Sequence, residues 1–192
     1  LQVTDEISSR LGKTCLAGVP IVPVSAMNGE GVDALRETIC SGARELPQRS
    51  LAGNFRLAVD RSFLLAGAGR VVTGTVFSGT ANVGDTLMLA PLGASLRVRD
   101  IHAQNRASET AIAGQRCALN VVGGDLRRAE IRRGDWVLAE PVCFGVTRFD
   151  AKIRVLADEE RALKNRTPVH VHLGAADVTG RVVTLEGADV AP

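Results

Sequence analysis

The spacing of apolar residues changes along the sequence, from three or four positions in the N-terminal part to two positions further on. In residues 1–13 and 32–43 the apolar residues recur mainly every three or four positions, which predicts two helices. Between them, residues 19–26 form a nearly continuous apolar run, VPIVPVSA, which predicts a strand covered on both faces. We therefore expect helix, strand and helix in residues 1–47.

From Phe55 the hydrophobic period falls to two. Further strand patterns follow, separated by turn residues, at 70–78, 85–90, 96–103, 116–122 and 135–139. Six strands at this spacing predict a small closed antiparallel β-barrel. Its interior is expected to hold Phe55, Leu57, Val59, Val76, Leu87, Leu119 and Val121.

Three more strand patterns follow this barrel. They lie in residues 147–156, 168–175 and 179–187. Three strands are too few for an independent barrel, so we expect only part of a second one.

The glycine-rich segment AGAGRVVTGTV, residues 66–76, resembles a phosphate-binding loop only in its spacing. Gly69 and Gly74 are correctly separated, but Thr75 stands where that loop needs a lysine. The β-branched residues after Gly69 favour a strand instead of the helix that a dinucleotide-binding loop opens. We therefore predict two strands joined by a glycine turn.

Composition excludes several classes of function. The 192 residues are 45% apolar and carry a net charge of only +2, which argues against a large basic surface for nucleic acid. Only 3% are aromatic, which argues against a surface on which bases stack. Four cysteines form no C-x-x-C pair, so reduced thiols are expected. Without a membrane-length apolar run or a leader, we expect a cytoplasmic protein with no membrane partner. The chain begins without Met inside a helical pattern, which suggests a piece of something longer.

Two segments resemble parts of the translational GTPases. VSAMNGEGVDALRETI is similar to their last nucleotide-binding motif and closing helix, where Ser25 and Ala26 would offer backbone N–H groups to guanine. This motif is weak, and an ordinary strand-to-helix turn is the alternative. GAGRVVTGTVFSGTANVGDTLML, followed by AGQRCALNV and IRRGDWVLAEP, resembles the second domain of those factors more specifically.

Within that class, FRLAVDRSF, RVRDIHAQN, TAIAGQRCALNV and VHVHLGAADVTGRV look most like the selenocysteine-specific elongation factors. The resemblance implies a mainly β fold with an α/β N-terminal remnant. The implied domains are the end of a GTP-binding domain in residues 1–50, the domain II barrel in 51–142 and part of a domain III barrel in 143–192.

The same resemblance implies selenocysteinyl-tRNA and the ribosome as partners, and an mRNA hairpin bound through domains that this chain lacks. GTP and Mg²⁺ would belong to the parent protein. We expect the phosphate-loop lysine, the D-x-x-G motif and the N-K-x-D motif of GTPases to be absent, and therefore no catalytic residue, no cofactor and no GTPase activity in this chain itself.

A ligand pocket is predicted from strand phase. In the strand at 116–122, one face is apolar and holds Cys117, Leu119 and Val121, so Arg116 points outward. In the strand that begins at Phe55, Asp60 points away from the apolar face, and Arg61 follows it. The resemblance implies that these three charged residues hold the esterified amino acid. It also implies that Gln115 lies beside the terminal adenosine. The plainer alternative is a surface ion pair between Asp60 and Arg61, with Arg116 simply solvated.

Other charged residues allow weaker predictions. Arg97 and Arg99 share a strand face, and with His102 they are candidates for tRNA contact, although most such runs are solvated. His170 and His172 also share a face, but the pattern does not favour a metal site, and we predict none.

Three functions remain open from the sequence. They are an aminoacyl-tRNA carrier specialised for selenocysteine, the GTPase subunit of sulfate adenylyltransferase, and a general translation factor barrel. The first requires Asp60, Arg61 and Arg116 to meet in one site, whereas the other two do not.

Overall fold

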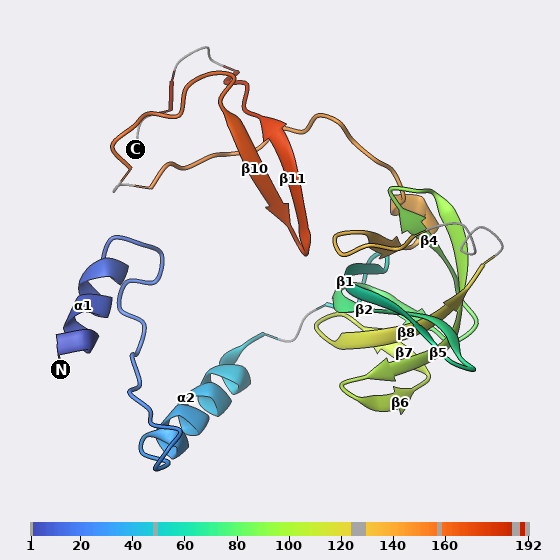
Figure 1. Cartoon of the computed structure of the whole chain (residues 1–192), viewed down its shortest axis with the longest axis horizontal. Helices are drawn as coiled ribbons and strands as arrows, with labels where there is room; N and C mark the ends of the chain where they lie inside the picture. The colour runs from blue at the N-terminus through green and yellow to red at the C-terminus, as the bar shows by residue number, and fades with distance from the viewer. Residues whose placement is uncertain (1, 48–49, 124–129, 157–158, 186–188, 191–192) are drawn as a thin grey trace. The chain divides into compact units, whose positions relative to one another are not determined.

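The computed structural model describes residues 2–47, 50–123, 130–156, 159–185 and 189–190 (Figure 1). The chain divides into two compact units. One consists of Leu1–Gln48, Ala151–Thr167 and Val182–Pro192, and the other of Arg49–Asp150 and Pro168–Arg181. The predicted domain boundaries stay predictions.

Six strands of the second unit close into an antiparallel barrel (Figure 1). Around the ring they are β1 (Arg56–Leu65), β2 (Gly69–Ser78), β8 (Arg116–Val122), β5 (Ala94–Ala103), β4 (Thr86–Ala90) and β9 (Trp136–Leu138). Strand β9 pairs back to β1, so the sheet has no open edge along this ring. The predicted six-stranded barrel is confirmed.

Sequence patterning missed the shortest strands of this unit. Strand β3 (Thr80–Asn82) pairs with β7 (Thr110–Ile112), and β6 (Arg106–Ser108) pairs with β5. A 3-10 helix, η2 (Glu140–Val142), follows the last barrel strand. β9 is equally short but apolar throughout, whereas these three strands contain few large apolar residues and give no hydrophobic signal.

The residues inside the barrel are those that the alternation of apolar and polar residues predicts. All seven residues expected inside are at most 4% exposed, and they belong to a single hydrophobic cluster. Val71, Leu138 and Ala58 depart from the expected phase, because each is buried without belonging to that cluster. Ala58 faces away from the interior. The backbone of Gly174, in the turn of a later hairpin, packs against Ala58 and Trp136 and covers this outer position.

The glycine-rich segment forms the β1–β2 hairpin, as predicted. Strands β1 and β2 pair from Arg56 opposite Ser78 to Leu65 opposite Gly69. Gly74 lies in β2, where an added Cβ would overlap the carbonyl oxygen of Ala58 on β1. A glycine is therefore needed here for close backbone approach, and not for binding phosphate.

The N-terminal residues contain the two predicted helices but not the predicted strand. Helices α1 (Gln2–Leu11) and α2 (Val32–Glu45) match the periodic segments. Residues 19–24 are in no regular structure, and Val24 is 51% exposed, so the strand prediction is wrong. A strand needs a partner backbone, and Pro20 and Pro23 each remove an N–H donor from this run.

The C-terminal residues form one hairpin. Strands β10 (Pro168–Leu173) and β11 (Ala176–Arg181) pair antiparallel, with His172 opposite Asp177. The strand expected in residues 147–156 is absent, because an apolar pattern without a pairing partner does not make a strand. The pattern at 179–187 is strand only as far as Arg181, and residues 186–188 lie outside the described residues. No helix in the described ranges is both long and apolar enough to cross a membrane.

Candidate functional site

A β-bulge in β1 sets the position of Asp60. Val59 lies opposite Gly74 on β2, and Arg61 lies opposite Thr73, so Asp60 is an extra residue between two paired ones. A bulge bends the strand and redirects the side chain at that point. The Asp60 carboxylate consequently faces the neighbouring strands, with a side chain that is 28% exposed.

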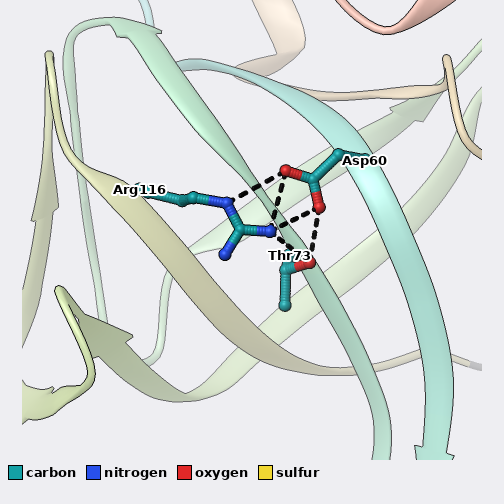
Figure 2. A network of polar contacts seen from close by, with 3 residues as sticks. All are labelled: Asp60, Thr73 and Arg116. Atoms are coloured by element: carbon teal, nitrogen blue, oxygen red, sulfur yellow. Dashed lines mark hydrogen bonds and ion pairs between the residues drawn. The ribbon is translucent and has the colours of Figure 1, made fainter. Parts of the chain in front are cut away.

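Arg116, the first residue of β8, holds this carboxylate with one edge of its guanidinium (Figure 2). Its Nε lies 3.1 Å from Asp60 Oδ2, and its Nη2 lies 2.7 Å from Asp60 Oδ1. Such a two-point ion pair is stronger and more directional than a single contact. The side chain of Arg116 is 55% exposed, so solvent limits the contribution of the pair to folding to roughly 0–1 kcal/mol.

Thr73 on β2 completes the network, and sequence reasoning did not find it. Its hydroxyl donates to Asp60 Oδ1 over 2.7 Å, and Arg116 Nη2 lies 3.4 Å from the same hydroxyl oxygen. The three side chains come from three adjacent strands, β1, β2 and β8 (Figure 2). A threonine among several in a strand gives no signal of this contact, which depends on the bulge at Asp60.

Arg61 lies beside this network without joining it. It follows the bulge and is exposed, and its guanidinium forms no hydrogen bond or ion pair with any other residue in the described ranges. The structure thus brings Asp60 and Arg116 into contact and leaves Arg61 as a neighbouring unpaired cation. One carboxylate and two guanidinium groups leave a local excess of positive charge, which favours an anionic ligand.

Gln115, which precedes Arg116, hydrogen-bonds to Ile112 within the turn that leads into β8. Its backbone N–H donates to the carbonyl of Ile112, and its side-chain Oε1 accepts from the N–H of Ile112. The thiol of Cys117 also lies 3.8 Å from Oε1. The amide oxygen of Gln115 therefore serves the turn that leads into β8, which leaves the amide nitrogen for any ligand.

Ser25 and Ala26 belong to the other compact unit. The backbone N–H of Ser25 donates to the carbonyl of Glu30 over 2.9 Å and closes a short turn. Gly31 completes this turn at φ +74°, where an added Cβ would overlap the carbonyl oxygen of Pro23. The N–H of Ser25 is therefore used within the turn, whereas the N–H of Ala26 bonds no residue in the described ranges.

The predicted tRNA-contact residues lie on the outer face of β5. Arg97 and Arg99 are exposed and line one open pocket of about 350 Å³ with Val83, Gly84, Val98 and Val122. His102 is not among these lining residues, and its Nε2 lies 3.7 Å from Asp100 Oδ2. The structure therefore groups the two arginines and leaves His102 in a separate, exposed pair.

His170 and His172 flank an aspartate on the β10–β11 hairpin. Asp177 Oδ1 lies 2.9 Å from His170 Nδ1 and 3.9 Å from His172 Nδ1, and the contact with His170 lowers the pKa of Asp177. The described part of the chain has no group of three His, Cys, Asp or Glu side chains arranged to hold a metal ion.

The expectation that the chain contains no D-x-x-G string is wrong. Residues 177–180 read Asp-Val-Thr-Gly, which matches that pattern of GTPases. In the structure these residues lie inside β11 and pair with β10, and Asp177 is engaged by His170. This string is part of a hairpin strand and not a phosphate-binding loop.

Comparison with known families matches two parts of the chain. Residues 69–138 match the model of elongation factor Tu domain 2. Residues 150–191 match the model of the β-barrel domain of selenocysteine-specific elongation factor.

Comparison with single proteins covers nearly the whole chain. The selenocysteine-specific elongation factor of Escherichia coli is 41% identical over 96% of this chain, which spans only 29% of that relative. Two solved structures of translation elongation factor SelB from Methanococcus maripaludis are similar in fold. The apo form has a TM-score of 0.78 and 29% identity, covering 94% of this chain and 39% of that one. The complex with the GTP analogue GppNHp has a TM-score of 0.77 and 28% identity, covering 93% and 40%.

Proposed function

This chain belongs to the selenocysteine-specific elongation factors, spanning 29% of the Escherichia coli relative, and from this premise we propose that it holds selenocysteinyl-tRNA during translation elongation. The barrel would bind the aminoacyl end. GTP and Mg²⁺ would act through parts of the family that this chain does not cover, as would any contact with an mRNA hairpin. Delivery to the ribosome at a recoded UGA codon belongs to the same proposal.

The contact between Asp60 and Arg116, with Arg61 beside it, carries this proposal. A selenol is more acidic than a thiol, so at neutral pH selenocysteine is largely an anion, whereas serine is neutral. A guanidinium therefore meets selenocysteine as an ion pair with hydrogen bonds, which is stronger than a hydrogen bond from the same guanidinium to the neutral hydroxyl of serine. Two arginines can therefore distinguish the two amino acids by charge.

We propose a structural role for Asp60 within the site. Both of its carboxylate oxygens accept from Arg116, and Oδ1 also accepts from Thr73. A carboxylate has about four acceptor positions, so little capacity remains for the α-amino group of the ligand. We propose that Asp60 mainly orients Arg116, and that Arg61 and the remaining donors of Arg116 meet the selenolate.

The remaining predicted residues would contact other parts of the tRNA or the guanine nucleotide. Gln115 would lie beside the terminal adenosine, and Arg97 and Arg99 would contact tRNA phosphates, with His102 a weaker candidate. Ser25 and Ala26 would belong to the guanine site of the GTP-binding domain. A sulfate adenylyltransferase subunit or a general translation barrel has no comparable support, since neither requires an unpaired arginine beside an oriented one.

The test compares selenocysteinyl-tRNA with seryl-tRNA on the same tRNA body. The wild-type chain should prefer the selenocysteinyl form by roughly tenfold or more, and Arg116→Ala should remove most of that preference. Arg116→Lys should restore only part, because lysine keeps the charge but loses the planar donor fork. The preference should also fall as the pH drops and the selenol becomes protonated.

Arg106→Ala is the matched control, because Arg106 is an exposed arginine on β6, a strand that does not pair with β1, β2 or β8. It should leave the preference unchanged. If Arg116→Ala weakens binding of both charged tRNAs by the same factor, Arg116 is a phosphate or structural contact and the proposal fails. A folded wild-type chain with no preference also contradicts it.

A further inference from the structure

We propose that Thr73 is a positioning residue of this site, one that fixes which edge of Arg116 is presented to the ligand. The effect of Thr73 on ligand preference rests on the proposed function, whereas its contacts with Asp60 and Arg116 do not. Thr73 pairs with Arg61 on β1 and with Ala118 on β8, so it lies on the strand between the two charged partners.

The Thr73 hydroxyl links both members of the ion pair. It donates to Asp60 Oδ1 over 2.7 Å, and its oxygen is 3.4 Å from Arg116 Nη2 (Figure 2). Each of the three side chains therefore contacts the other two. Threonine suits this position because its branched Cβ restricts χ1 in a strand, which holds the hydroxyl in one direction.

Within this arrangement, two nitrogens of the Arg116 guanidinium bond to neighbouring side chains and the third bonds to none in the described ranges. Nε and Nη2 are engaged by Asp60 and Thr73, whereas Nη1 forms no hydrogen bond with any residue that the structure describes. A guanidinium held in one orientation loses less conformational entropy when a ligand binds. Thr73 would thus raise the preference for an anion without contacting it.

The first test needs no ligand. Arginine Nε–H groups are observable by NMR, and the Nε–H of Arg116 donates to Asp60 Oδ2. In the 192-residue chain, Thr73→Val should accelerate solvent exchange of this proton roughly three- to tenfold, because it removes one of the bonds that orient Asp60. Thr73→Ser, which keeps the hydroxyl, should restore most of the protection.

Thr86→Val is the matched control. Thr86 is an exposed threonine of the same barrel on β4, which does not pair with β1, β2 or β8, and its hydroxyl bonds no residue in the described ranges. It should leave the exchange rate of Arg116 Nε–H unchanged. If Thr73→Val also leaves this rate unchanged, Thr73 does not position Arg116 and the inference is overturned, whatever the tRNA measurements give.

The second test links position to preference through a double-mutant cycle. Thr73→Val alone should lower the preference for selenocysteinyl-tRNA over seryl-tRNA roughly three- to tenfold. In the Arg116→Ala background the same substitution should change nothing further, because its effect passes through Arg116. A similar loss in both backgrounds, or an equal loss for both tRNAs, overturns the inference. Faster exchange of the Arg116 proton in a chain without preference would instead refute the proposed function alone.

Discussion

The barrel and the N-terminal helices carry equally regular hydrophobic patterns, yet only the barrel buries its apolar face. In β8, Leu119 is 0% exposed, whereas Ile39 on the apolar face of α2 is 61% exposed. Neither α1 nor α2 contains a buried residue. The same kind of pattern thus leads to a packed core in one region and to an open surface in the other.

The difference lies in what supplies the opposing surface. A closed barrel packs each strand against the others, so its interior needs no further element. A helix can bury its apolar stripe only against a separate surface, and its stability comes largely from that packing. A hydrophobic period therefore predicts an element and the face that favours burial, but not that burial occurs.

The largest expected effect of this contrast is on amide hydrogen exchange. Opening the barrel strands requires nearly global unfolding, whereas α1 and α2 can open locally. Amides of β1, β2, β5 and β8 should be protected roughly a thousandfold or more above those of the two helices. Equal protection in residues 2–47, measured by mass spectrometry or NMR on the native chain, would contradict the comparison.

A pair of matched truncations should show the contrast in stability. Leu119→Ala should lower the free energy of unfolding by about 2–5 kcal/mol, because it leaves a cavity in the barrel. Ile39→Ala should change it by no more than about 0.5 kcal/mol. Urea denaturation can follow both through Trp136, the one tryptophan of the chain, whose ring is 5.3 Å from that of Phe77 in the barrel. Similar losses for the two variants would contradict this assignment of the core.

A smaller effect should appear in the pH dependence of stability. Burial in the barrel raises the pKa of Cys117 to about 11, while the unfolded thiol ionises near 9.0. The native state therefore holds this proton more tightly, and its stabilisation is complete below pH 9.0 and is lost as the pH rises towards 11. The expected loss over this window is at most about 2–3 kcal/mol.

The slope of stability against pH, and not its absolute value, measures this effect. Cys117→Ala should flatten the decline across that window, although it also lowers stability at every pH by leaving a cavity. Cys40→Ala is the matched control, since Cys40 is exposed on α2 and should leave the slope unchanged. An unchanged slope in Cys117→Ala would show that this thiol does not titrate as its burial predicts.

Much of the barrel follows from the sequence by itself. Alternation at period two identifies Leu57, Leu119 and Val121 as interior residues, and the same phase turns Arg116 outward. Side-chain direction in a regular strand is a local property of the backbone, so it can be read without knowing which strands are neighbours. The two N-terminal helices follow from local periodicity for the same reason.

Only the tertiary structure decided how the site is assembled. The bulge between Val59 and Arg61 interrupts the period of two, and the contacts of Asp60 with Thr73 and Arg116 follow from the pairing of three strands. The failed strand at residues 19–24 has the same origin, because an apolar run becomes a strand only when another backbone pairs with it. Strand pairing joins residues far apart in the chain, and no local pattern encodes which atoms then meet.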